Sequence, residues 1–379
     1  MSELTWVEIS RTALSSNIAR LRSLLAQSTL LCACVKANAY GHGLCEAGRI
    51  FFDAGADWLS VHSMHEARCL RKSGLACPIY ILGPISPDDY PEALQLDCRL
   101  VVYNEDDLPP LAAAARACGR QARLHVKVET GTNRQGVGAG LFESLCAAVT
   151  GSPDLMLEGL ATHFANIEDT TDHSFAQAQL RSFNEAIAIL AARGIRVPIV
   201  HCANSAATIL MPAAHFSMVR TGIAAYGMWP SNETYVSFVR ERINGFTLTP
   251  ALTWKARVAQ VKDVPPGEFI GYGCTFKTGH PTRLAVIPVG YYDGYDRGIA
   301  GGHVLIRGQR APIRGRICMN LLMAEVTDIR DACVGDEAVL VGRDADECIT
   351  AEQIARWAST INYEVTTRIN DRIPRIIVD

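Results

Sequence analysis

The sequence predicts an α/β protein in which a (β/α)8 barrel of the TIM type is followed by a mostly-β domain. Before Phe246, eight short apolar runs alternate with helical stretches, as expected for such a barrel. After it, the pattern changes to apolar alternation interrupted by turns. The chain has 379 residues, 49% hydrophobic and 20% charged, so it can bury the cores of both domains.

The chain begins with a predicted strand at Trp6–Ile9 and a helix at Arg11–Leu25, where apolar residues recur at helical spacing. Ser63 begins a capping box for a later helix, and Ser174–Arg193 places its large apolar side chains on one face. A doubly wound sheet has the same periodicity and is the alternative at this point. The eight runs that predict barrel strands are Leu31–Val35, Trp58–Val61, Ile79–Leu82, Leu100–Tyr103, Leu124–Val128, Leu157–Thr162, Ile199–Cys202 and Phe216–Val219.

From Leu248 onward, alternating apolar residues predict strands around 258–261, 284–287 and 339–342. One helix is expected in this part, at Ala351–Ser359, with Thr350 as its N-cap and a glutamine three residues later. No internal repeat, low-complexity tract or long linker interrupts the pattern.

Composition limits the function classes. A formal net charge of -3 gives no electrostatic case for nucleic acid or an anionic membrane as a partner. The first residues lack a basic stretch followed by an apolar run, and no apolar run approaches transmembrane length. The 13 cysteines are scattered, odd in number and without C-x-x-C, so neither a disulfide framework nor a metal site follows. Buried thiols in a reducing cytosol are the simpler account, and we expect a cytoplasmic protein.

Polar side chains follow the ends of five predicted barrel strands. Active sites of such barrels gather at the C-terminal ends of the strands, and phosphate is commonly held after strands seven and eight. This placement favours the barrel over the doubly wound sheet. The residues are Lys36 after strand one, Arg134 after strand five, His163 after strand six, Asn204 and Ser205 after strand seven, and Arg220, Gly222 and Ile223 at strand eight.

Lys36 stands where the first barrel strand ends. An amine in a partly dry setting is costly to keep charged, and a neutral amine can attack an aldehyde to form a Schiff base. Taken alone, Lys36 would more often be a snorkelling lysine in a loop. However, the sequence Lys36-Ala37-Asn38-Ala39-Tyr40-Gly41-His42-Gly43 resembles the pyridoxal-phosphate lysine motif of the alanine racemases.

Two further features fit this cofactor. Asn204 and Ser205 open a short helix whose N–H groups and hydroxyl suit a phosphate, with two more N–H groups at Gly222 and Ile223; an ordinary N-cap is the alternative. Because arginine stays protonated, a pyridine nitrogen facing Arg220 would not readily receive a proton, and this favours racemisation over transamination. Alone, Arg220 would more often be a salt-bridged surface arginine.

Racemisation requires acid–base groups on both faces of the substrate carbon. Lys36 is one candidate and Tyr272 the other. A phenol is a weak acid, so cationic neighbours must favour the phenolate, and His163 and Arg220 are candidates for that role. Taken alone, Tyr272 would be interpreted as an aromatic residue in a turn, and His163 as a core histidine with its hydrogen bonds satisfied.

Four other residues have a functional and a structural interpretation. Arg134 can bind a substrate carboxylate through two parallel hydrogen bonds. Lys127 requires a polar or charged partner if it is buried on its strand. Met319 and Tyr363 would individually be dismissed as packing residues.

Further motifs extend the resemblance to the alanine racemases from Trp6 to Arg375. It implies a barrel at residues 10–243 and a β-domain at 1–9 and 244–379. It also implies a head-to-tail homodimer, with each barrel site completed by the partner's β-domain. The motifs are His201-Cys202-Ala203-Asn204-Ser205, Arg220-Thr221-Gly222-Ile223-Ala224-Ala225-Tyr226-Gly227, Gly290-Tyr291-Tyr292-Asp293-Gly294-Tyr295 and Thr360-Ile361-Asn362-Tyr363-Glu364, in family order.

The resemblance also implies residue roles. Lys36 carries the cofactor and handles the proton on the D-alanine side, while Tyr272 of the partner subunit does so on the L side. His163 contacts that tyrosine, and Arg220 faces the pyridine nitrogen. Lys127 matches a lysine that is carbamylated in many relatives. Phosphate contacts are matched by Tyr40, Ser205, Gly222, Ile223 and Tyr363, carboxylate contacts by Arg134 and the Met319 backbone, and a narrow entrance by Tyr291 and Tyr363.

The chain departs from the family pattern at three places. Thr132-Asn133 replaces a more usual Met-Gly, Asn320 stands where an aspartate is normal, and Gly271 where a serine often precedes the tyrosine. These changes bear on the rate, the pH optimum and the breadth of the substrate range rather than on the reaction type.

The resemblance implies L-alanine and D-alanine interconversion, which supplies D-alanine for peptidoglycan. A serine-specific or broad-range racemase is the nearest alternative, although the tyrosine at 363 favours alanine. A barrel-type decarboxylase would pair the pyridine nitrogen with a carboxylate, where this chain has Arg220. A non-catalytic pyridoxal-phosphate carrier would lack the β-rich segment that contains Tyr272.

Overall fold

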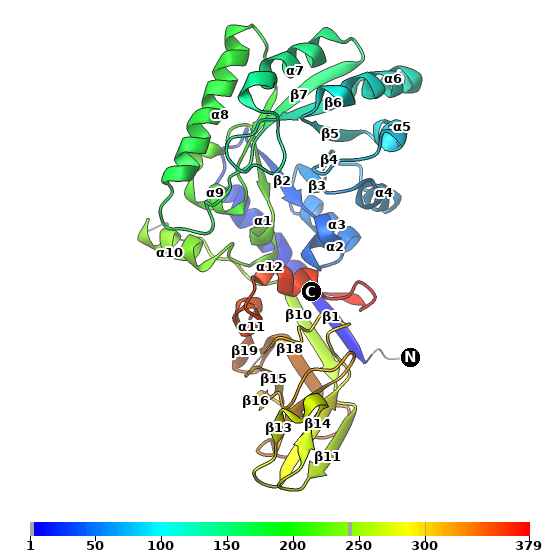
Figure 1. The fold of residues 1–379 in the computed structure, drawn as a ribbon, viewed down its shortest axis with the longest axis vertical. Helices are drawn as coiled ribbons and strands as arrows, with labels where there is room; N and C mark the ends of the chain where they lie inside the picture. The colour runs from blue at the N-terminus through cyan, green and yellow to red at the C-terminus, as the bar shows by residue number, and fades with distance from the viewer. Residues whose placement is uncertain (1–3, 242–244, 300) are drawn as a thin grey trace. The chain divides into compact units, whose positions relative to one another are not determined.

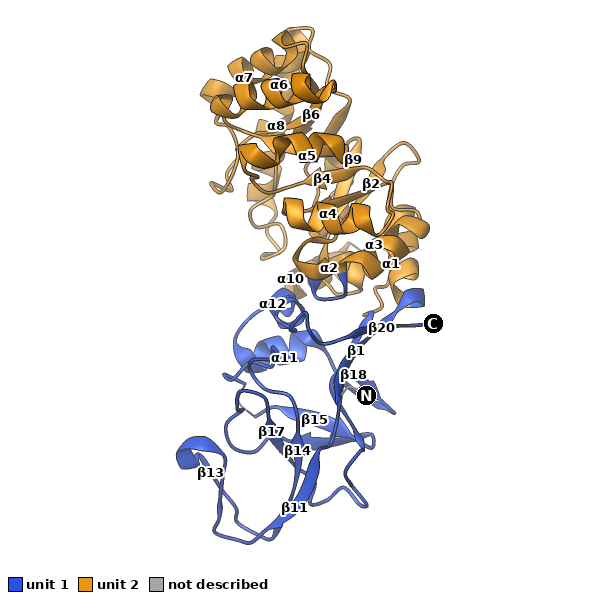
Figure 2. Cartoon of the chain, turned by 90° about the vertical axis from the view of Figure 1, so that its right-hand side faces the viewer, with its two compact units in different colours: residues 1–12, 40–43, 251–379 blue, residues 13–39, 44–250 orange. Residues whose placement is uncertain are grey.

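The computed structural model describes residues 4–241, 245–299 and 301–379. The chain forms two compact units, coloured separately in Figure 2. The barrel unit comprises Ala13–Ala39 and Leu44–Pro250, and the β unit comprises Met1–Thr12, Tyr40–Gly43 and Ala251–Asp379. The boundary expected between 243 and 244, and the first three residues of the expected β-domain, lie outside the described residues.

The described part of the barrel unit contains eight parallel strands in the order β8-β7-β6-β5-β4-β3-β2-β9. The strands from β2 to β8 lie in consecutive order, and the last strand, β9, pairs with the first, β2, so the sheet curls towards closure. A doubly wound sheet would instead reverse its strand order in the middle, so this alternative is excluded. All eight predicted strands are present, with ends displaced by two residues at most. They are β2 (Leu30–Cys34), β3 (Trp58–Val61), β4 (Ile79–Ile81), β5 (Cys98–Val102), β6 (Ala122–Lys127), β7 (Leu155–Ala161), β8 (Ile199–His201) and β9 (Met218–Thr221).

Helices connect these strands (Figure 1). The predicted capping box is present in α4, where the Ser63 and Glu66 side chains each bond the other's backbone N–H. The helices are α1 (Arg11–Ser23), α3 (Leu44–Asp53), α4 (Met64–Lys72), α5 (Tyr90–Gln95), α6 (Leu108–Cys118), α7 (Ala139–Gly151), α8 (Ser174–Ala192), α9 (Ser205–Leu210) and α10 (Asn232–Arg240), with 3₁₀ turns at Pro87–Asp89, Glu105–Asp107, Pro212–Ala214 and Ile223–Tyr226.

The segment labelled α2 (Lys36–Tyr40) is not a right-handed helix. Ala37, Asn38, Ala39 and Tyr40 all have φ of 53–54°, so the chain makes one left-handed turn directly after Lys36. An L-residue in this region costs roughly 1–2 kcal/mol. The Asn38 side chain supports the turn by accepting a hydrogen bond from the Leu44 N–H at 2.9 Å.

The β unit is built around a sheet with the order β16-β15-β18-β10-β1-β20, to which β19 is added through β18. The first strand, β1, pairs antiparallel with β10 and parallel with the last strand, β20, so the first and last strands belong to the same sheet. Smaller sheets are formed by β11-β14-β17 and β12-β13. The strands are β1 (Thr5–Ser10), β10 (Leu252–Arg257), β11 (Gln260–Val264), β12 (Phe269–Ile270), β13 (Phe276–Lys277), β14 (Thr282–Ile287), β15 (His303–Ile306), β16 (Gln309–Pro312), β17 (Leu322–Glu325), β18 (Glu337–Asp344), β19 (Glu347–Ile349) and β20 (Arg375–Val378).

Within its described residues, the β unit has two helices, α11 (Ala351–Ala358) and α12 (Asn362–Thr367), and a 3₁₀ turn at Tyr272–Cys274. The α11 helix confirms the predicted one, including the capping box between Thr350 and Gln353. Over the described ranges of both units, no helix has the length and apolar character needed to cross a membrane.

Candidate active site

Four cationic side chains come together in the barrel unit. Lys127 is the last residue of β6 and is buried, and its amine donates a hydrogen bond to Gln135 at 2.9 Å. Burial first, and then the charges of Arg220, Arg134 and Lys36, lower the pKa of Lys127 to about 7. Lys127 is therefore partly neutral near pH 7, inside a region with an excess of positive charge.

His163 follows β7 and meets the same cations. Burial and the charges of Arg220, Lys127 and Arg134 hold the pKa of His163 well below its usual range. The histidine is therefore neutral near pH 7, which contradicts the prediction that it provides a positive charge for a phenolate. The cause is the surrounding charge, since every cation nearby opposes a further one.

Arg220, on β9, is buried and held by the ends of neighbouring strands. Its Nη2 donates to the Thr162 carbonyl at 2.9 Å, and its Nη1 bonds the Nδ1 atom of His201. Nη2 also lies 3.3 Å from Nδ1 of His163. The alternative of a salt-bridged surface arginine is wrong, because these partners are a carbonyl and two imidazoles inside the barrel.

Ser205 connects the loops that follow β8 and β9. Its hydroxyl oxygen accepts hydrogen bonds from the N–H groups of Gly222 at 2.9 Å and Ala224 at 3.3 Å. Asn204 is the N-cap of α9, and its side chain accepts from the Ala207 N–H. The structure thus brings together Ser205, Gly222 and the turn that begins at Ile223, and Asn204 has the capping role that was its alternative.

The loop that carries Arg134 is organised by Glu129. The Glu129 carboxylate accepts the Gly131 N–H at 2.6 Å, and Thr132 donates from its hydroxyl to the His163 carbonyl at 2.6 Å. Burial would raise the pKa of Glu129, but backbone N–H groups from Gly131 to Arg134 lower it overall. Glu129 was not predicted, although its position two residues after Lys127 was a possible signal.

Tyr40 and Tyr363 lie side by side in the β unit, with ring centroids 6.1 Å apart. Tyr40 ends the left-handed turn that begins after Lys36, and Tyr363 lies in the first turn of α12. Two residues predicted for one phosphate site are therefore neighbours.

The remaining predicted residues, Tyr272, Tyr291 and Met319, also belong to the β unit. Tyr272 is 69% exposed and begins the 3₁₀ turn between β12 and β13. Tyr291 and Met319 lie on adjacent loops, joined by a hydrogen bond from the Tyr292 N–H to the Met319 carbonyl. A side chain at Gly290 would collide with this carbonyl, so the close approach of the two loops requires glycine.

Comparison with known proteins identifies the family to which the chain belongs. Residues 9–230 match the family model "Alanine racemase, N-terminal domain", and residues 251–377 match "Alanine racemase, C-terminal domain". The chain belongs to the alanine racemase family. It is 39% identical over 377 residues to the alanine racemase of Leptospira interrogans, covering 99% of this chain and 96% of that protein.

Two crystal structures of the family are also similar. The alanine racemase of Bacillus anthracis with bound L-Ala-P has a TM-score of 0.93 and 33% identity, covering 100% of this chain and 96% of that one. The enzyme from the D-cycloserine producer Streptomyces lavendulae has a TM-score of 0.92 and 36% identity, covering 100% and 98%. The barrel and the mostly-β domain predicted from the sequence are thus confirmed as the fold of this family.

Proposed function

We propose that the protein is a pyridoxal-phosphate-dependent racemase that interconverts L-alanine and D-alanine by a two-base mechanism. The observation that carries this proposal is the cationic cluster of Lys36, Lys127, Arg134 and Arg220. Such a cluster fits a ligand that brings a phosphate and a substrate that brings a carboxylate. The alanine racemase names of the relatives supply the substrate.

The residues present fit the cofactor. Ser205, Gly222 and Ile223 would hold the phosphate with a hydroxyl and backbone N–H groups, together with Tyr40 and Tyr363. The cofactor supplies, when bound, the electron-withdrawing ring that stabilises negative charge on the α-carbon.

Arg220 would face the ring nitrogen as a permanent donor, with neutral His163 beside it. The amine of Lys36 would bind the cofactor at its aldehyde carbon.

Two bases would act on opposite faces of the α-carbon. Lys36 moves the proton on the D side, and Tyr272 of the partner subunit moves it on the L side. The exposure of Tyr272 (69%), Met319 (56%) and Tyr291 (40%) in a single chain supports a homodimer that covers them. In this dimer each barrel is completed by the other subunit's β unit, and Tyr291 and Tyr363 narrow the entrance.

Arg134 and the Met319 N–H would bind the substrate carboxylate. Lys127 would react with carbon dioxide: the neutral amine attacks the carbon, loses a proton and becomes an anionic carbamate. Its lowered pKa, about 7, makes the neutral amine available, and the carbamate would neutralise part of the cationic cluster. Electron density that ends at a bare amine in protein handled with bicarbonate would contradict this assignment.

The assignment of Lys36 is tested by borohydride reduction of the cofactor-loaded protein, followed by peptide mapping. We expect the label on Lys36, and a label on another lysine would reject the assignment. In deuterated water, L-alanine should exchange its α-hydrogen as D-alanine appears. Release of carbon dioxide would instead indicate a decarboxylase, and a cofactor-loaded protein without turnover would indicate a carrier.

The substrate is tested with a panel of alanine, serine, lysine and arginine. We expect the highest kcat/KM for alanine, because in the proposed dimer Tyr291 and Tyr363 would narrow the entrance and favour a small side chain. A comparable value for serine or the basic amino acids would favour a broad-range racemase. An alanine preference fits a cytoplasmic role in D-alanine supply for peptidoglycan.

The shared site is tested with mixed dimers. Lys36→Ala and Tyr272→Phe should each lower kcat by roughly 10²–10⁴-fold, since each removes one proton-transfer group. Mixing the two variants should restore activity, because a heterodimer has one site with both bases intact. Mixtures no more active than the separate variants would place both bases in one chain.

A further inference from the structure

A continuous line of polar side chains runs from Arg220 into the barrel interior. Arg220 bonds Nδ1 of His201, and Nε2 of His201 lies 2.8 Å from Nδ1 of His125. Nε2 of His125 then lies 3.1 Å from Oε2 of Glu158. Both histidines are fully buried, and Glu158 is 8% exposed.

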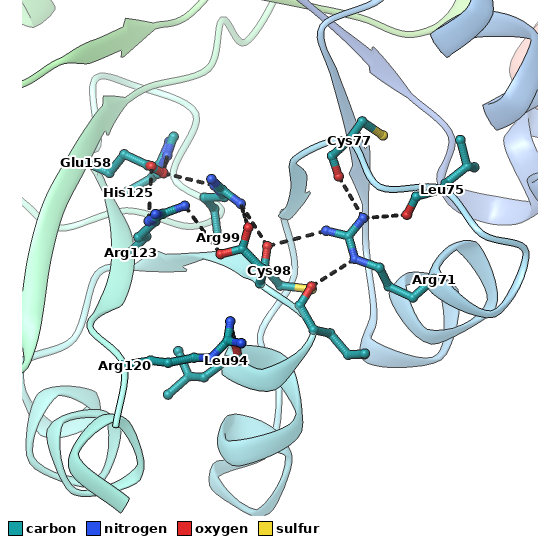
Figure 3. A network of polar contacts seen from close by, with 12 residues as sticks. Arg71, Leu75, Cys77, Leu94, Cys98, Arg99, Arg120, Arg123, His125 and Glu158 are labelled. Atoms are coloured by element: carbon teal, nitrogen blue, oxygen red, sulfur yellow. Dashed lines mark hydrogen bonds and ion pairs between the residues drawn. The ribbon is translucent and has the colours of Figure 1, made fainter. Parts of the chain in front are cut away.

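The far end of this line is fixed by charge. Figure 3 shows Glu158 and His125 beside Arg99 and Arg123. Arg99 Nε lies 3.3 Å from Glu158 and Arg123 Nε 3.9 Å, and both arginines also pair with Asp97. Burial alone would raise the pKa of Glu158, but the His125 hydrogen bond and the arginines lower it overall, so Glu158 is ionised near pH 7.

The donors and acceptors allow one arrangement of protons. Arginine only donates, so Nδ1 of His201 must accept and its proton sits on Nε2. This proton is donated to Nδ1 of His125, whose own proton is then on Nε2 and is donated to the carboxylate of Glu158. The reverse direction would point an N–H of His201 at Arg220, and it would set the unprotonated Nε2 of His125 against the carboxylate of Glu158 with no proton between them.

We propose that His125 and Glu158 are positioning residues for Arg220: they fix His201 as the Nε2–H tautomer, so that it accepts from the guanidinium and orients it. The consequence for turnover rests on the proposed function, in which Arg220 faces the cofactor ring. The proton arrangement itself is a property of the cofactor-free protein.

The surrounding structure is shaped to hold this line. Leu124 pairs with Leu157, and His125 with Gly159, so Glu158 is the extra residue of a β-bulge in β7. Bulges re-aim side chains, and this one brings the carboxylate to His125. A side chain at Gly159 would meet Nδ1 of His125 at 2.3 Å, so glycine makes room for the imidazole.

Aromatic rings hold the two imidazoles in place. Tyr80 stacks on His125 with centroids 4.6 Å apart and meets His201 edge-on at 5.5 Å. Trp58 packs against His125 with ring centroids 5.8 Å apart. The guanidinium of Arg99 lies over the Trp58 ring, with Cζ 5.0 Å from the ring centroid. Burial lowers the pKa of both histidines, which agrees with two neutral rings.

The first experiment measures the protons directly. Cofactor-free protein labelled with ¹⁵N-histidine is examined by long-range ¹H–¹⁵N spectra between about pH 6 and 9. We expect His125 and His201 to remain neutral with the proton on Nε2 throughout. A ring that titrates in this range, or that carries its proton on Nδ1, would overturn the proposal whether or not the protein is a racemase.

The second experiment uses His125→Phe, which keeps a ring against Tyr80 and removes the acceptor for His201. We expect kcat to fall by roughly tenfold or more, with a smaller change in KM, because Arg220 loses its orientation. Asp97→Asn is the control: it removes a charge beside Arg99 and Arg123 and leaves the contact between Glu158 and His125.

Equal kcat for His125→Phe and Asp97→Asn would reject the positioning role. If His125→Phe does not fold, the spectra of the unmodified protein still decide. A wild-type protein without racemase activity would defeat the proposed function but not the proton arrangement.

Discussion

At the scale of single residues, two departures from the family pattern have a structural reason. Asn133 has φ of 51°, in the left-handed region where glycine is usual and asparagine is the best-tolerated substitute. Gly271, where the family often has serine, has φ of 74° and ψ of −173°, a conformation nearly restricted to glycine.

Gly271 yields the first prediction. Gly271→Ser should strain the turn before Tyr272 by about 1–3 kcal/mol, since its Cβ would also lie 3.0 Å from Met323. We expect a lower kcat with the cofactor still bound, measured by steady-state kinetics and absorbance. Gly279→Ser, at a glycine whose Cβ position has open space, is the control, and equal effects would contradict the explanation.

Asn320 donates a hydrogen bond to the Asp293 carboxylate at 3.3 Å. Asn320→Asp would place two carboxylates at this distance, so they would share one proton more readily and the pKa of one would rise. We expect a new ionisation on the acidic side of the kcat/KM profile. A profile identical to that of the wild type would show that the two groups separate instead.

Lys127 makes the fold weaker at neutral pH than at alkaline pH. Its folded pKa, about 7, lies below the unfolded value of 10.5, so the unfolded chain binds more protons between these values and the free energy of unfolding rises with pH there. Lys127→Met should therefore stabilise the cofactor-free protein by roughly 2–4 kcal/mol at pH 7, with the gain vanishing towards pH 10.5.

Lys255 is the matched control for this prediction. It pairs with Glu8 at 3.0 Å and Glu337 at 3.4 Å, and its pKa is raised, with the carboxylates outweighing burial. The stability it contributes is present below its unfolded pKa and is lost above its folded one. Denaturant unfolding should show Lys255→Met to be destabilising at pH 7, and a stabilisation by both substitutions would reject the electrostatic account.

At the scale of elements, the left-handed turn after Lys36 stores strain where the chemistry is proposed. Ala37→Val should lower the free energy of unfolding by about 1–3 kcal/mol more than Ala113→Val, because a β-branched residue is disfavoured at φ of 54° and Ala113 lies on the ordinary helix α6. Denaturant unfolding at constant pH measures the difference. Equal losses would mean that the turn relaxes without cost.

The elements also show what sequence reasoning can reach. Buried parallel strands are continuous apolar runs, so all eight barrel strands were predictable. Two helices were predictable from their N-cap residues, Ser63 and Thr350. The left-handed turn was not, because Ala37 and Ala39 carry no preference for it.

At the scale of the whole molecule, predictability depended on where a residue's partners come from. The proximity of Lys36, Arg134 and Arg220 was predictable because strand ends converge in any such barrel. His125 and Glu158 were missed because their partners lie on other strands and a histidine within an apolar run has no local signal. The charge assigned to His163 was wrong because it depended on neighbours that only the fold brings close.

The barrel order ends at β8 and β9, which meet through individual hydrogen bonds such as Ser217 N–H to the Val200 carbonyl and Arg220 N–H to the Ala203 carbonyl. This seam between β8 and β9 should open locally more readily than the paired strands, and its backbone amides should exchange with solvent earlier. Ser205 follows one side of the seam and Gly222 the other. An anion bound by both Ser205 and Gly222 would connect the two sides of this seam. Ligand binding should therefore stabilise the barrel where its strands are held by the fewest hydrogen bonds.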